Sequence, residues 1–131
     1  MPQGIDEDRP YTIPFPRVVE ELVEILGALL TATVASVGET RRLKMWIDGQ
    51  ESTSSRRQQV LRFALQVAMI LVDRYDREVA QSWFQGLNRH LQDEVPALLL
   101  RDLNAPDKHG FLDVVEVEKR ILSAARNFAE R

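Results

Sequence analysis

The stretch Val60–Val72, VLRFALQVAMILV, decides the fold class of this chain. Only Arg62 and Gln66 interrupt its apolar run, and because they lie four positions apart they would share one narrow polar stripe on a helix. The run is shorter than the about 20 apolar residues that cross a membrane. It is also longer than a buried strand of about 4–8 residues. We therefore predict a central buried helix over residues 53–75, opened by a capping box of Ser55 and Gln58.

The sequence on both sides of this stretch has helical periodicity and no strand pattern. An apolar face that includes Leu29 predicts the first helix. The expected flanking helices cover residues 17–29, 31–37, 39–48, 76–84, 96–103 and 112–128, and Asp76 would be the N-cap of the helix over residues 76–84. The fold class is therefore all-α. We expect a helix-turn-helix-like bundle over residues 17–75, joined through the central helix to a small helical module over residues 76–131.

Residues 1–16 hold four of the six prolines and an acidic cluster. Proline removes hydrogen-bond donors and disfavours helix, so we expect an extended, mobile, proline-rich acidic arm. Tyr11, Ile13 and Phe15 alternate, so part of the arm would lie in a groove. The alternative is a disordered tail.

The composition limits the possible classes of function. There is no cysteine, which fits a reducing compartment, and the acidic N-terminal segment has no apolar run typical of a secretory signal. We therefore expect a cytoplasmic protein without a membrane partner. The net charge is −3, yet residues 31–62 hold six basic and three acidic side chains. A local basic segment is typical of nucleic-acid contact, although a solvated helix face has the same charge count.

The segment Thr31–Gly49, TATVASVGETRRLKMWIDG, has the pattern of a helix-turn-helix. In that motif a short helix braces a second helix, whose polar residues enter the major groove of DNA. Leu43 and Trp46 would face the core. The candidate DNA-binding residues, which would project outward, are Thr40, Arg41, Arg42 and Lys44. Arginine can bind guanine through two hydrogen bonds, while threonine and lysine suit phosphates or base edges.

Catalytic and metal-binding motifs are not evident. His90 and His109 are nineteen positions apart, without carboxylates at metal-ligand spacing, so surface or capping roles are favoured. No P-loop, GxGxxG, GxSxG or HExxH motif occurs. We therefore expect no enzyme, no catalytic residue, no cofactor and no metal.

The C-terminal half carries several short motifs in a distinctive order. They are Trp83-Phe84, Asn88-x-x-Leu91, Pro96-Ala97-x-Leu99 and Ala124-Ala125-x-x-Phe128, which follow a Trp46-x-x-Gly49 pattern at the end of the helix-turn-helix. Trp83 and Phe84 by themselves are more typical of a core, and Asn88 of a turn closed by its side chain. In this order and spacing, over residues 25–131, the motifs resemble those of Xre/MbcA/ParS-type antitoxins. The loop over residues 103–110 is longer than the family's tight glycine turn.

The resemblance implies an antitoxin that inhibits a RES-domain toxin, an enzyme that destroys NAD, and that binds its own promoter DNA. We would expect a homodimer or a toxin–antitoxin hetero-oligomer. The residues that it implies for toxin binding are Trp83, Asn88, Pro96, Ile121, Arg126, Phe128 and Glu130. The alternative is a stand-alone transcriptional regulator whose C-terminal half only dimerises.

A specific inhibitory mechanism would use the last helix as a plug for the toxin's pocket. Val114, Val117, Ile121 and Phe128 have the spacing of anchors for a groove. Glu130 could then mimic a phosphate group of NAD. The alternative is that this stripe packs on the protein's own core.

Overall fold

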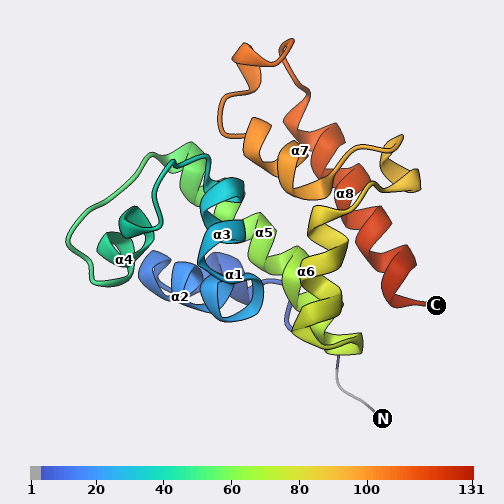
Figure 1. The fold of residues 1–131 in the computed structure, drawn as a ribbon, viewed down its shortest axis with the longest axis horizontal. Helices are drawn as coiled ribbons and strands as arrows, with labels where there is room; N and C mark the ends of the chain where they lie inside the picture. The colour runs from blue at the N-terminus through green and yellow to red at the C-terminus, as the bar shows by residue number, and fades with distance from the viewer. Residues whose placement is uncertain (1–3) are drawn as a thin grey trace.

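The computed structural model describes residues 4–131, and this part of the chain consists of helices joined by turns, without a named strand. The all-α prediction is confirmed. Figure 1 shows α5 running through the middle of the molecule with the other helices around it. The helices are α1 (Arg9–Thr12), α2 (Phe15–Leu26), α3 (Ala28–Ala35), α4 (Arg41–Ile47), α5 (Ser55–Arg74), α6 (Arg77–Gln85), α7 (Pro96–Asp102) and α8 (Val114–Ala129), with 3₁₀ turns η1 (Arg89–Leu91) and η2 (Pro106–Lys108).

The helix α5 is the predicted central helix. It packs against α1, α2, α3, α6 and α8, and Leu61, Leu65 and Leu71 are fully buried. One hydrophobic cluster runs from Val18 in α2 to Ala125 in α8, so the two predicted helical parts share a single core. No helix among the described residues is long and apolar enough to cross a membrane.

The predicted N-cap of α5, Ser55, is wrong by one residue. Ser54, whose backbone is extended, is the N-cap, and its side chain accepts a hydrogen bond from the Arg57 backbone nitrogen at 3.2 Å. The third helical residue is therefore Arg57, which cannot complete a capping box. Gln58 instead donates from its side chain to the Thr53 carbonyl oxygen.

The first predicted helix is too long. Gly27 adopts a φ of +85°, which ends α2 at Leu26 and starts α3 in a new direction. Leu29, expected on the buried face, is consequently 80% exposed. The C-cap of α3 is Ser36, whose backbone is left-handed with a φ of +59°.

The prediction of an extended arm over residues 1–16 is wrong for its described part. Residues 9–12 form α1, α2 begins inside the predicted arm at Phe15, and Pro10 is buried. Arg62, on the polar stripe of α5, donates to the carbonyl oxygens of Pro10 and Ile13, both at 2.8 Å. Residues 1–3 lie outside the described part.

Two further contacts hold this segment to the rest of the molecule. Arg9 pairs with Glu21 of α2 through both carboxylate oxygens. Glu7 accepts hydrogen bonds from Gln66 of α5 at 2.9 Å and from Arg126 of α8 at 2.6 Å. We call residues 5–13 the N-terminal strap. It covers the polar stripe of α5 and connects it to α8, a role that the sequence pattern did not reveal.

Candidate functional site

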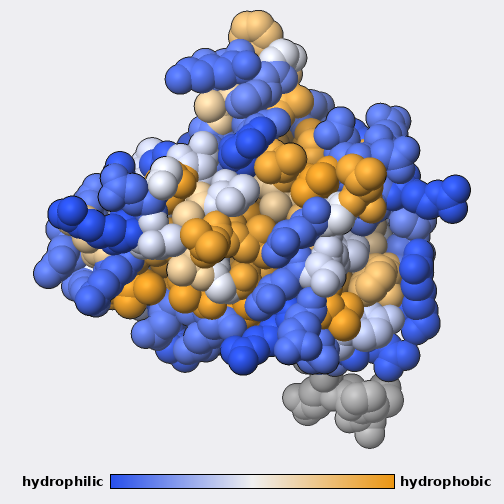
Figure 2. Space-filling model, in the orientation of Figure 1, coloured by the Kyte–Doolittle hydropathy of each residue, from blue (hydrophilic) through white to orange (hydrophobic). Residues whose placement is uncertain are grey.

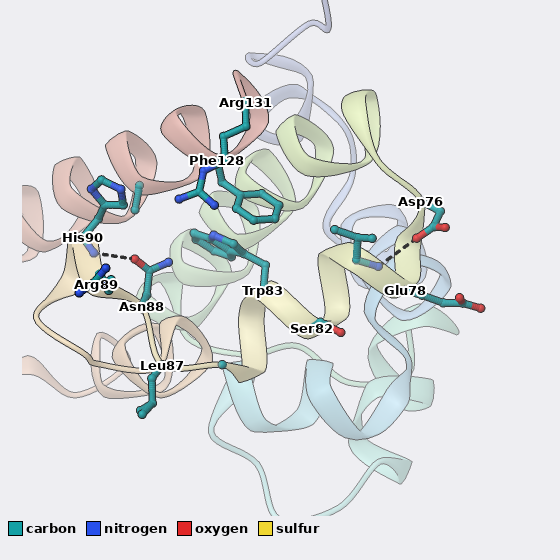
Figure 3. A pocket seen from close by; sticks show the side chains of 13 residues that line it. Asp76, Glu78, Ser82, Trp83, Leu87, Asn88, Arg89, His90, Phe128 and Arg131 are labelled. Atoms are coloured by element: carbon teal, nitrogen blue, oxygen red, sulfur yellow. Dashed lines mark hydrogen bonds between the residues drawn. The ribbon is translucent and has the colours of Figure 1, made fainter.

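A groove of about 740 Å³ lies between α6, the loop that follows it and the end of α8. Figure 3 shows its lining, with Trp83 and Phe128 facing each other across the floor. Leu87 lies at the lip and is 76% exposed. The groove therefore has an aromatic floor and an apolar edge that solvent reaches.

The helix α6 positions the Trp83 side of the floor. Asp76 is the N-cap of this helix, as predicted, and accepts a hydrogen bond from the Val79 backbone nitrogen at 3.0 Å. Because Trp83 and Phe84 are adjacent, they point to different sides of the helix. Phe84 enters the core at 0% exposure, and Trp83 retains 7% exposure beside the groove. Their rings meet edge to face, with centroids 5.4 Å apart.

Asn88 shapes the loop at one end of the groove. Its side chain accepts a hydrogen bond from the His90 backbone nitrogen at 3.0 Å, which closes η1 as predicted for a turn asparagine. Its backbone nitrogen donates to Glu94 at 3.1 Å, and its carbonyl oxygen accepts from Asp93 at 2.8 Å. This turn fixes the positions of Arg89 and His90 at the groove.

The end of α8 contributes Phe128, the second aromatic residue of the floor, and Arg131. Phe128 packs on Tyr75 with ring centroids 5.2 Å apart, and the Tyr75 hydroxyl donates to the Phe128 carbonyl oxygen at 3.3 Å. Arg74 donates to the carbonyl oxygen of Arg131 at 3.1 Å. The Arg131 guanidinium lies 5.3 Å from the centre of the Phe128 ring. These contacts place one aromatic ring and one cation beside the groove.

The groove brings together three of the residues assigned to toxin binding by the resemblance: Trp83, Asn88 and Phe128. It does not include the others. Pro96 is buried at the start of α7, while Arg126 pairs with Glu7 and Glu130 is exposed just after α8. The lining residues Leu87, Arg89, His90 and Arg131 were missed. The first three flank Asn88 in the sequence, and only the fold brings Arg131 to the same groove.

The apolar stripe of α8 is not available as a plug. Ile121 is fully buried and Val117 is 7% exposed, because this face of α8 packs within the shared core against α5. The expectation that Val117 and Ile121 anchor the helix in a toxin is therefore wrong, and the alternative of packing on the protein's own core holds for them. Phe128 is half-buried against Tyr75.

A second candidate site is the exposed face of α4. Thr40, Arg41, Arg42 and Lys44 are all exposed, while Leu43 and Trp46 are buried, as predicted. The helix packs mainly on α2, where Trp46 lies 5.9 Å from the Phe15 ring. The segment thus presents a helix (α3), a turn over residues 36–40 and a second helix with basic side chains toward solvent.

Acidic side chains partly offset this basic face. Arg42 pairs with Glu51 at 2.9 Å, and a small hollow of about 300 Å³ beside α4 is lined by Glu39, Arg41 and Glu51 among others. Arg57 of α5 lies behind the face and donates to the Ala35 carbonyl oxygen at 2.7 Å. Burial lowers the pKa of Arg57, and the nearby charge of Arg42 lowers it further.

Among residues 4–131, no group of three or more His, Cys, Asp or Glu side chains is placed to hold a metal ion. Comparisons with protein-family models, with curated proteins and with solved structures gave no match to the chain.

Proposed function

We propose that the protein is an antitoxin that binds and inhibits a RES-type NAD-degrading toxin and that binds promoter DNA through α4. The observation that carries the proposal is the groove of α6, η1 and α8. It unites Trp83, Asn88 and Phe128, which lie up to 45 positions apart in the chain and which the family resemblance implies for toxin binding.

The groove has the chemistry of a protein-binding site. Tryptophan and arginine are the residue types that contribute most often to binding energy at interfaces, and here Trp83, Arg89 and Arg131 line the same groove. The lip residue Leu87 exposes apolar surface that a partner would remove from water. Because the turn at Asn88 and the contacts of Phe128 fix the shape of the groove, the protein would lose little conformational freedom on binding a partner.

Inhibition in this proposal relies on the surface that the fold leaves exposed. The toxin would contact the groove and the exposed end of α8, where Glu130 is accessible. The buried stripe of α8 would support this surface without touching the toxin. Arg126 would act indirectly, since its guanidinium is paired with Glu7 of the N-terminal strap.

The test is co-expression with a RES-domain NAD-degrading enzyme. The wild-type protein should restore growth and co-purify with the enzyme. Leu87→Ser should weaken both effects, whereas Leu29→Ser should not, although Leu87 and Leu29 are similarly exposed, at 76% and 80%. An enzyme that remains toxic and uncaptured beside the wild-type protein would refute the proposal.

A second candidate function is that of a stand-alone transcriptional regulator. The exposed basic side chains of α4, which include Arg41 and Lys44, favour it. Binding of the upstream DNA by a protein that captures no partner enzyme would support this reading. A protein that neutralises the enzyme without binding that DNA would exclude it.

A further inference from the structure

The charges around the groove are separated by sign. Arg89 and Arg131 lie on the side of η1 and α8, while Asp76 and Glu78 lie at the start of α6. Figure 3 shows this separation, with the aromatic floor between the two ends. A ligand that spans the groove therefore meets cationic side chains at one end and carboxylates at the other.

The arginines of the basic end are free to take a ligand. Neither Arg89 nor Arg131 has an ion pair or a side-chain hydrogen bond among residues 4–131. Arg131 instead lies against the Phe128 ring, 5.3 Å from its centre. Guanidinium groups form strong paired hydrogen bonds with carboxylates, so an acidic ligand group would find two suitable partners here.

The size of the groove limits what it can hold. At about 740 Å³ it lies within the about 300–1,000 Å³ of ordinary ligand pockets, which accept a few side chains and not a whole helix. The floor of Trp83 and Phe128, with Leu87 at the lip, favours a large apolar side chain. Such a group would bury apolar area that the protein now exposes.

We infer that the groove binds a short segment of the partner protein in which a large apolar side chain stands next to carboxylates. The apolar side chain rests on Trp83 and Phe128, and the carboxylates bind Arg89 and Arg131. This inference rests on the proposed function and adds to it the chemistry of the toxin surface that is recognised. The acidic end at Asp76 and Glu78 repels the reverse orientation, so the segment binds in one direction.

The first test uses isotope-labelled full-length protein and three blocked peptides: acetyl-Phe-Glu-Glu-amide, acetyl-Phe-Gln-Gln-amide and acetyl-Phe-Lys-Lys-amide. In NMR titrations, the acidic peptide should shift the Trp83 indole and Asn88 side-chain signals. The neutral peptide should bind about tenfold more weakly, because it lacks charge-assisted hydrogen bonds. The basic peptide should bind least. Equal binding of all three, or unshifted groove signals at millimolar peptide, would overturn the inference.

A charge reversal makes the test sharper. The double variant Arg89→Glu, Arg131→Glu should prefer the basic peptide over the acidic one. Lys119→Glu is the matched control, since Lys119 is an exposed cation on α8 that does not line the groove. A control that changes the preference as much as the double variant would contradict the assignment.

The same variants separate this inference from the proposed function. If the RES-type enzyme binds wild type and the double variant equally, the inference fails and the antitoxin proposal stands. If the acidic peptide binds as described and the enzyme does not, the antitoxin proposal fails and the groove's ligand chemistry is supported.

Discussion

Replacing Arg62 by alanine should release the N-terminal strap from α5. The Arg62 guanidinium donates to two backbone carbonyl oxygens, of Pro10 and of Ile13, at 2.8 Å each. A hydrogen bond with a charged partner contributes about 1.5–3 kcal/mol to stability. Once the strap detaches, water can donate hydrogen bonds to both carbonyl oxygens. We therefore expect the two hydrogen bonds together to contribute only the lower half of this range. We expect a loss of about 1.5–2 kcal/mol in the free energy of unfolding.

Urea denaturation of both proteins measures this loss directly. A change of this size is a large fraction of the about 5–15 kcal/mol that stabilises a typical domain. Arg56→Ala is the matched control, because Arg56 lies on the same helix, is exposed and has no ion pair within residues 4–131. Amide hydrogen exchange should in addition accelerate over residues 5–13 in Arg62→Ala and not in Arg56→Ala. Equal midpoints for the two variants, or an unchanged exchange rate in the strap, would refute the reasoning.

Three further predictions concern the core, the charges and DNA. Leu65→Asp should unfold the protein, because it buries an unpaired charge in a fully buried position of α5, and circular dichroism would detect the loss of helix. The pKa values of Glu7 and Glu21 are lowered, chiefly by hydrogen bonds from Gln66 and Arg9 respectively. The two carboxylates therefore stabilise the folded state fully above their unfolded-state pKa of 4.5, and this stabilisation is lost as the pH falls through their lowered folded-state pKa values. Thermal melts at a series of pH values should show the loss as a falling melting temperature. Arg41→Ala with Arg42→Ala should weaken binding to upstream DNA and reduce its salt dependence by a log–log slope of about 0.9 per lost phosphate contact, as mobility shifts at several salt concentrations would show.

The central helix was predictable because its signal is local. A run that is apolar on nearly every side has few structural solutions, and only Arg62 and Gln66 break it. The polar stripe formed by these two residues was recognised, but its partner was not. The prolines of the strap argue against helix, and the two hydrogen bonds from Arg62 come from a helix about 50 positions away in the chain.

The candidate site was also predictable only where the sequence signal is local. The cap at Asp76 and the turn at Asn88 follow from side-chain chemistry within a few residues and were predicted. The apolar stripe of α8 allowed two interpretations, because an apolar helix face has the same sequence pattern whether the protein's own core or a partner protein covers it. The sequence could not show that Arg89 and Arg131 line the same groove, because this depends on how η1 and the end of α8 meet.

The most direct test of the antitoxin proposal is the rate of NAD consumption by the purified RES-type enzyme, titrated with this protein. The proposal predicts that activity falls to a stoichiometric end point with wild type and with Leu29→Ser. Leu87→Ser should require about tenfold more protein, because it removes apolar contact at the lip of the groove. Undiminished NAD consumption at an excess of wild-type protein would contradict the proposal. Equal inhibition by Leu87→Ser and Leu29→Ser would show that the groove is not the inhibitory surface.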